Sequence, residues 1–175
     1  RSIIAQRSKN LPDTRALGTK RDVYAEGHEW AAHSMFPTHV DEAAARVRVG
    51  GSECAKPYDA SLLNISAMSY GALSGNAVSA LNRGAKAAGC YHNTGEGGIS
   101  KFHASGGADL VWNIGTGYFA CGGTGADGAR HFDPQMFAEN AARAQVRMIE
   151  VKLSQGAKPA HGGVLPAANI TPALA

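Results

Sequence analysis

The segment Leu62-Leu-Asn-Ile-Ser-Ala-Met-Ser-Tyr-Gly-Ala-Leu-Ser74 joins an apolar run to a turn rich in serine and glycine. We expect a strand over Leu62–Met68 and, directly after the turn, a helix over Ser74–Gly89. Serine is a favourable N-cap for this helix, and Leu73 and Val78 occupy the positions of a hydrophobic staple. The order strand, turn, helix is typical of a βα unit. Barrels and doubly wound sheets bind their ligands at such turns, at the carboxyl ends of parallel strands.

Other apolar stretches repeat this design along the chain. Three more strands are expected, over Cys90–Thr94, Leu110–Ile114 and Val146–Leu153. A further helix begins after Asp133, because this N-cap aspartate is followed by Pro134 at the first helical position. These elements amount to about four βα units. A complete (β/α)8 barrel has eight strands and typically ~250 residues, so the 175 residues predict half of one.

The first part of the chain has a different pattern. Short turns interrupt residues 1–60, and only Arg46-Val-Arg-Val49 alternates as a half-exposed strand does. The predicted fold is therefore α/β, with an irregular N-terminal arm or cap over 1–60 and the N-terminal half of a TIM-type barrel over 61–175. An open half-barrel exposes sheet edges and apolar faces, which proteins avoid. We therefore expect a second polypeptide, or a larger complex, to complete the barrel.

The composition is that of a globular chain, with 44% hydrophobic and 18% charged residues and a formal net charge of +3. No apolar run is long enough to predict a membrane span, and the scattered basic residues give no nucleic-acid footprint. Cys54, Cys90 and Cys121 are widely spaced, which predicts reduced thiols rather than disulfides or a metal site. We therefore expect an intracellular, reducing compartment, either the cytoplasm or an organelle.

Two other patterns have simple structural interpretations. Segments that begin at Gly115 and Gly123 match dinucleotide-binding fingerprints, but neither lies cleanly between a strand and the start of a helix. We therefore expect no dinucleotide site. His92 and His161 are candidate proton donors, yet a histidine without local partners in the sequence is more often structural, and we expect that role for both.

Six segments of the chain together resemble the FMN-binding synthase domain of glutamate synthase, and more closely the stand-alone proteins of the FMN-binding glutamate synthase family. The resemblance runs from about Asp22 to Ala175. Its segments, in family order, are Ile65–Ser74, Asn82–Lys86, Asn93–Gly98, Ile114–Tyr118, Phe132–Pro134 and Lys152–Pro159. It implies a flavin-binding barrel that carries out the reductive amination of 2-oxoglutarate, or of a related 2-oxo acid, in glutamate biosynthesis.

The resemblance also implies roles for individual residues. The turn that faces the isoalloxazine ring and ribityl chain of FMN contains Ala67, Met68 and Ser69, and Gln155 contacts the flavin as well. Glu96 handles protons while a 2-iminoglutarate intermediate is reduced. Lys158 holds a carboxylate of the substrate or the electron-rich edge of the flavin, and Lys152, in the preceding strand, is a candidate to point into the barrel.

One position departs from the family pattern. Many glutamate synthases have a glutamine where this chain has Val164, which removes a polar contact expected for 2-oxoglutarate. The FMN phosphate is usually bound by loops after strands seven and eight of such a barrel, which the predicted half does not include. Two hypotheses follow: an oxidoreductase fragment or subunit that supplies the ring-facing half of an FMN site, or a catalytically inactive structural subunit of a larger assembly.

Overall fold

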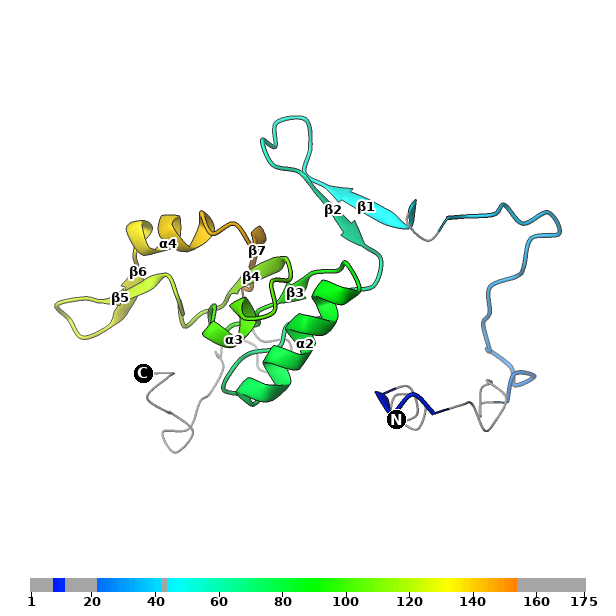
Figure 1. The fold of residues 1–175 in the computed structure, drawn as a ribbon, viewed down its shortest axis with the longest axis horizontal. Coiled ribbons are helices and arrows are strands. Elements are labelled where there is room, and N and C mark those ends of the chain that lie inside the picture. The colour runs from blue at the N-terminus through cyan, green and yellow to red at the C-terminus, as the bar shows by residue number, and fades with distance from the viewer. Residues whose placement is uncertain (1–7, 12–21, 42–43, 154–175) are drawn as a thin grey trace. The chain divides into compact units, whose positions relative to one another are not determined.

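The computed structural model describes residues 8–11, 22–41 and 44–153. Its contacts group the chain into two units, one up to His39 and one from Val40 onward. In the first unit, residues 22–39 run through turns and extended backbone, and the Asp22 side chain accepts a hydrogen bond from the Tyr24 N–H at 3.0 Å. No helix among the described residues is long and apolar enough to cross a membrane. The secondary structure that matters for function lies in the second unit (Figure 1).

A parallel sheet forms the centre of the second unit. Its strands are β3 (His92–Asn93), β4 (Leu110–Ile114) and β7 (Val146–Val151), with β4 in the middle. Both pairings are parallel, with Asn93 opposite Val111 and Ile114 opposite Val151. The parallel sheet and its helices confirm the α/β class and three of the expected strands. The half-barrel itself stays a prediction.

The expected strand over Leu62–Met68 is only partly formed. Ile65 makes an isolated parallel bridge to His92, while Leu63 is 82% exposed. The reason lies in Asn64, whose side-chain oxygen accepts the Tyr91 N–H at 3.2 Å and so replaces a backbone partner. Backbone pairing begins only afterwards, where the Ile65 N–H donates to the Tyr91 carbonyl and the Asn93 N–H donates to the Ile65 carbonyl, each at 3.0 Å.

The helices start where the sequence predicts. Helix α2 (Gly75–Ala87) is capped by the Ser74 hydroxyl, which accepts the Ala77 N–H at 3.2 Å. Helix α4 (Pro134–Ala141) is capped by Asp133, which accepts the N–H groups of the second and third helical residues. A third, short helix, α3 (Lys101–Ala104), was not expected from the sequence.

The two faces of the sheet differ in character. On one face, the fully buried Trp112 stacks on Phe137 of α4, with ring centroids 5.5 Å apart. Ile114 and Cys121 belong to the same buried cluster. On the opposite face, which we call the inner face, alternate residues of β4 and β7 are Val111, Asn113, Met148 and Glu150. The helix-covered face is therefore the apolar core, and the inner face carries polar groups.

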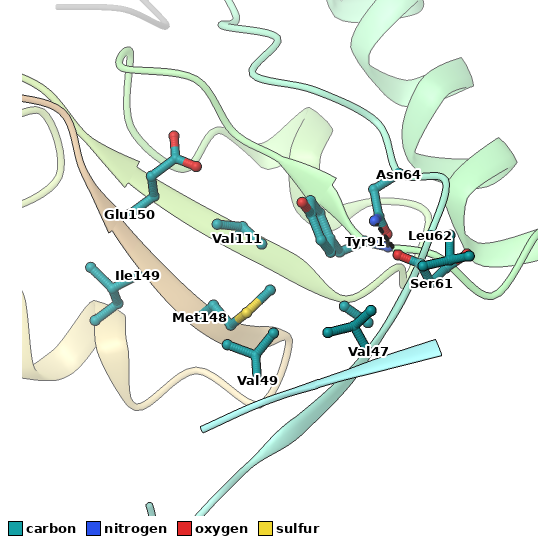
Figure 2. Close-up of a pocket in the computed structure, with 11 residues that line it drawn as sticks. Val47, Val49, Ser61, Leu62, Asn64, Tyr91, Val111, Met148, Ile149 and Glu150 are labelled. Atoms are coloured by element: carbon teal, nitrogen blue, oxygen red, sulfur yellow. Dashed lines mark hydrogen bonds between the residues drawn. The ribbon is translucent and has the colours of Figure 1, made fainter. Parts of the chain in front are cut away.

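A β-hairpin lies beside the amino-terminal part of the inner face. Strands β1 (Arg46–Val49) and β2 (Tyr58–Ser61) pair antiparallel. The Tyr58 hydroxyl donates to the Asp109 carboxylate at 3.0 Å, just before β4 begins. Val47 and Val49 face Val111 and Met148 across a hollow of about 430 Å³ (Figure 2). The predicted strand at Arg46–Val49 is thus confirmed, although all four of its residues are exposed.

A second hairpin follows β4. Its strands β5 (Gly122–Thr124) and β6 (Arg130–Phe132) pair antiparallel. The segment that begins at Gly123 has the sequence pattern of a dinucleotide-binding fingerprint. In the structure it forms a hairpin strand and its turn. It does not lead from a parallel strand into a helix, as such a fingerprint requires.

His92 of β3 is a fully buried polar residue of the core. The Asn82 side-chain amide of α2 donates to its Nδ1 atom at 3.3 Å, while the Asn82 oxygen accepts the Ala108 N–H at 3.4 Å. Burial, together with the nearby His103, lowers the pKa of His92 from 6.5 to about 4. The imidazole is therefore neutral in the folded protein near pH 7, in keeping with a structural role.

We predict that His92 makes the stability of the protein depend on pH. The unfolded chain takes up a proton near pH 6.5, whereas the folded chain does so only near pH 4. This contribution to stability is fully present above pH 6.5 and falls by up to about 3 kcal/mol as the pH decreases through that window. Urea unfolding of the full-length protein at a series of pH values measures it. His92→Asn keeps an acceptor for Asn82 and removes the titration, so identical pH dependence in both proteins would contradict the assignment.

Candidate functional site

Polar and glycine residues gather at the carboxyl ends of the parallel strands. Glu96 follows β3, Gly115 follows β4, and Lys152 follows β7. Ser69 follows the bridge at Ile65. Because parallel strands place their carboxyl ends at the same edge of a sheet, these four residues come from distant parts of the sequence to one edge. We call this group, together with Gly95, the edge site.

An ion pair joins two strands across the edge site. Lys152 Nζ lies 2.9 Å from Glu96 Oε2, and the two side chains are 36% and 29% exposed. The Lys152 N–H donates to the Ile114 carbonyl at 2.9 Å, which holds the lysine backbone beside the end of β4. Solvent screens a pair of this exposure, so it contributes at most about 1 kcal/mol to stability. The pair places an accessible cation and an accessible carboxylate side by side.

Glycines allow the edge site to be this compact. Gly95 has φ of +66°, and a Cβ added there would overlap the Ser69 hydroxyl and lie 2.6 Å from the Ser69 nitrogen. A Cβ on Gly115 would lie 2.7 Å from the Cβ of Glu96. Any larger residue at either position would displace Ser69 or Glu96. The glycines of this segment are therefore required by close packing as well as by backbone conformation.

The loop that carries Glu96 is held by buried hydrogen bonds. The Gly95 N–H donates to Asn93 Oδ1 at 3.0 Å. The Thr94 hydroxyl donates to the Gly95 carbonyl at 3.0 Å and accepts the Asn113 N–H at 3.0 Å. Thr94 thus ties the end of β3 to β4. These bonds place the Glu96 backbone before any ligand is present.

A second polar layer lies one step below the edge site on the inner face. Glu150 accepts hydrogen bonds from the side-chain amides of Asn93, at 3.2 Å, and of Asn113. Because side chains on one face recur every second residue, the residues two positions onward are Gly95, Gly115 and Lys152. The Asn113 side-chain oxygen is buried and has no hydrogen-bond partner among the described residues. The inner face below the edge site is therefore polar and acidic.

The structure brings together some of the predicted site residues. Ser69 and Glu96 lie in the edge site, and the half-buried Met68 directs its carbonyl toward His103, with 2.9 Å between Met68 O and His103 Nε2. Ala67 is exposed. Gln155 and Lys158 lie outside the described residues, as do His161 and Val164. Their predicted roles therefore stay predictions.

For other residues near the site, the sequence alone predicted no specific role. Lys152 was only a candidate to point into the barrel, yet it pairs with Glu96. Alternation along Val146–Leu153 would have placed Glu150 and Lys152 on the same face, and this signal was present in the sequence. The role of His103 had no such signal, because it depends on the packing of a short helix that the sequence did not predict.

The cysteines lie apart from this chemistry. Cys90 and Cys121 are buried, Cys54 is exposed, and all three are free thiols. Burial raises the pKa of the Cys121 thiol.

Within residues 8–11, 22–41 and 44–153, no group of three or more His, Cys, Asp or Glu side chains is arranged to hold a metal ion.

Comparison with known proteins gives a consistent set of relatives. Residues 20–175 match the family described as a conserved region in glutamate synthase. The chain is 39% identical to the glutamate synthase large subunit-like protein YerD of Bacillus subtilis (strain 168) over 158 residues, which cover 89% of the chain and 28% of that protein. It is 31% identical to a glutamate synthase large subunit-like protein of Rhizobium meliloti (strain 1021) over 172 residues, which cover 93% and 34%.

A third relative matches a smaller part of the chain. The archaeal-type glutamate synthase (NADPH) of Thermotoga sp. (strain RQ2) is 37% identical over 105 residues, which cover 60% of the chain and 17% of that protein. No solved structure matches the chain. The chain spans about a third or less of the length of these relatives. Because the family match covers residues 20–175 and includes the whole edge site, the chain belongs to the glutamate synthase family.

Proposed function

We propose that the edge site is part of an FMN-dependent, glutamate synthase-type active site that reductively aminates 2-oxoglutarate or a related 2-oxo acid. The observation that carries the proposal is the ion pair between Glu96 and Lys152, 2.9 Å apart and partly open to solvent, with Glu96 in a loop whose Gly95 packs on Ser69. Membership of the glutamate synthase family supports the same reaction class. The glutamate synthase relatives are much longer, so the remainder of the barrel and any partner subunit are part of the proposal.

The residues of the edge site fit the ring of a flavin. An isoalloxazine ring is flat and has a polar pyrimidine edge that gains negative charge on reduction. Ser69 offers a hydroxyl, the exposed Ala67 leaves the turn open to a ligand, and Lys152 offers a positive charge at the same edge of the sheet. Gly95 and Gly115 let Ser69 and Glu96 pack directly on the strand ends, so that both side chains lie at the edge where the ring would bind. When bound, FMN supplies the hydride for the reduction.

The ion pair suggests how the chain's own residues act. A 2-oxo acid brings a carboxylate, which competes with Glu96 for the Lys152 ammonium. Once Lys152 binds this carboxylate, Glu96 is released to exchange a proton with the substrate nitrogen. Reduction of an imine adds a hydride to carbon and a proton to nitrogen, and positioned acid–base groups typically contribute 10²–10⁴-fold to such proton transfers. In this proposal Lys158 and Gln155 complete the substrate and flavin contacts.

The first test is Glu96→Gln in the full-length protein. The substitution keeps the shape of the side chain and removes its ability to exchange a proton. We expect FMN to remain bound while turnover falls by roughly 10²–10⁴-fold. Flavin titration and steady-state kinetics measure the two quantities. Turnover equal to that of the wild type would remove Glu96 from the mechanism.

The second test is Lys152→Met, compared with Arg147→Gln on the same strand. Arg147 pairs with Asp109 at 3.0 Å at the amino-terminal end of β7, so it is a matched control at the opposite edge of the sheet. We expect Lys152→Met to raise the KM for the 2-oxo acid by roughly 10-fold or more, since a substrate carboxylate loses its charged partner. Arg147→Gln should leave the KM unchanged. An equal effect of both substitutions would show that only strand stability is affected.

The third test uses two glycines. Gly95→Ala forces a Cβ into the space of Ser69, so we expect weaker FMN binding and a loss of stability of roughly 1–3 kcal/mol. Gly84→Ala, in the exposed middle of α2 where a Cβ meets nothing within 4 Å, should stabilise the protein by roughly 0.5–1 kcal/mol. Flavin titration and thermal unfolding measure both variants. A wild-type protein that binds no flavin would favour the structural-subunit hypothesis instead.

A further inference from the structure

His103 lies outside the edge site but is connected to it. It belongs to α3, and its side chain is fully buried. The Ser100 hydroxyl accepts the His103 N–H at 3.3 Å, and the Ser100 N–H donates back to His103 Nδ1 at 3.2 Å. This reciprocal arrangement is a capping box, with histidine in the place usually taken by glutamate or glutamine. The other ring nitrogen, Nε2, lies 2.9 Å from the carbonyl oxygen of Met68.

These contacts determine where the imidazole carries its proton. A backbone N–H can only donate, so Nδ1 of His103 must accept from Ser100. Burial lowers the pKa of His103, which keeps the ring neutral near pH 7. A neutral ring with an accepting Nδ1 carries its proton on Nε2, and Nε2 therefore donates to the Met68 carbonyl. The imidazole thus links α3 to the turn that contains Ala67, Met68 and Ser69.

Holding the Met68 carbonyl also orients Ser69. The peptide group between the two residues is planar and trans, so its C=O and N–H bonds point in opposite directions. When the carbonyl points to His103, the Ser69 N–H points away from it. The Ser69 nitrogen lies against Gly95 in the edge site. The Met68 N–H, in turn, donates to the Asn93 carbonyl at 3.2 Å.

Neighbouring contacts hold His103 itself in place. Phe102 of α3 packs on Tyr70, which follows the turn, with ring centroids 4.7 Å apart. The His92 ring lies 5.1 Å from the His103 ring and is anchored by Asn82. His103 is therefore a rigid polar contact between the core and the turn.

We propose that His103 is a positioning residue for the flavin-facing turn: its Nε2–H holds the Met68 carbonyl from behind and so orients Ser69 toward the ligand. His103 does not touch the reacting atoms. This inference rests on the proposed function for the identity of the ligand, FMN. The orientation of the turn by His103 is a property of the chain itself and is measurable without any ligand.

The test compares three substitutions in the full-length protein. The amide nitrogen of His103→Gln lies about as far from the backbone as Nε2 and can still donate to the Met68 carbonyl, so we expect FMN affinity within about twofold of the wild type. His103→Asn keeps the Ser100 contact, but its shorter amide does not reach Met68. His103→Phe fills the space and removes both hydrogen bonds. For Asn and Phe we expect FMN affinity to fall by roughly 5- to 100-fold, because the Met68 carbonyl loses its hydrogen-bond partner and the turn is no longer held.

A readout without flavin separates this inference from the proposed function. Hydrogen–deuterium exchange should be faster at residues 67–70 in the Asn and Phe variants than in the wild type and the Gln variant. Lys101→Ala, an exposed substitution in the same helix that leaves the Met68 hydrogen bond in place, is the control and should change exchange at the turn less. If His103→Phe does not fold, the Gln and Asn pair still gives the answer.

Each outcome has a distinct meaning. Wild-type protein that binds no FMN, with the expected exchange differences, would overturn the proposed ligand and keep the positioning role. FMN binding with equal affinity and equal exchange in the Gln and Asn variants would overturn the positioning role and keep the proposed function.

Discussion

Strand β4 is the element on which the arrangement of the site depends. All five of its residues are buried, and it is hydrogen-bonded in parallel to β3 on one side and β7 on the other. The parallel pairing brings Glu96, Gly115 and Lys152 to one edge, although they are separated by many residues in the sequence. If β4 slipped by one residue against its neighbours, Asn113 would turn to the opposite face of the sheet, away from Glu150 on β7. The buried face of β4, with Trp112 against Phe137, opposes such a shift.

The edge site combines two charged side chains with two closely packed glycines. Gly95 and Gly115 allow Ser69 and Glu96 to lie directly on the strand ends, and Lys152 completes the group from the third strand. Below it, Glu150 accepts hydrogen bonds from two asparagine side chains, so the polar character continues into the inner face. Both side chains of the pair are partly exposed, so solvent screens their attraction and the pair adds little to stability. In the proposed function, the role of the pair is to bind an anionic substrate.

Local signals were sufficient for much of the fold. Ser74 and Asp133 cap their helices as predicted, and the strand at Leu110–Ile114 has the expected bounds. These elements follow from side-chain to backbone hydrogen bonds and from hydrophobic pattern, which act within a few residues. The short elements were missed, namely α3, strand β2 and the β5–β6 hairpin, because three or four residues carry too little hydrophobic pattern to predict an element. The strand expected at Leu62–Met68 was overestimated, because the Asn64 side chain takes a backbone partner from it.

The sequence by itself determined the α/β class, the helix starts, the glycine-rich turns after the strands, and the candidacy of Ser69 and Glu96. Only the tertiary structure decided that Lys152 is the partner of Glu96 and that Gly95 makes room for Ser69. It also decided that His103 binds the Met68 carbonyl, behind the turn that contains Ser69. The physical reason is that caps and turns are formed by neighbours in sequence. An ion pair or a buried hydrogen bond between strands depends on register and packing, which no local segment contains.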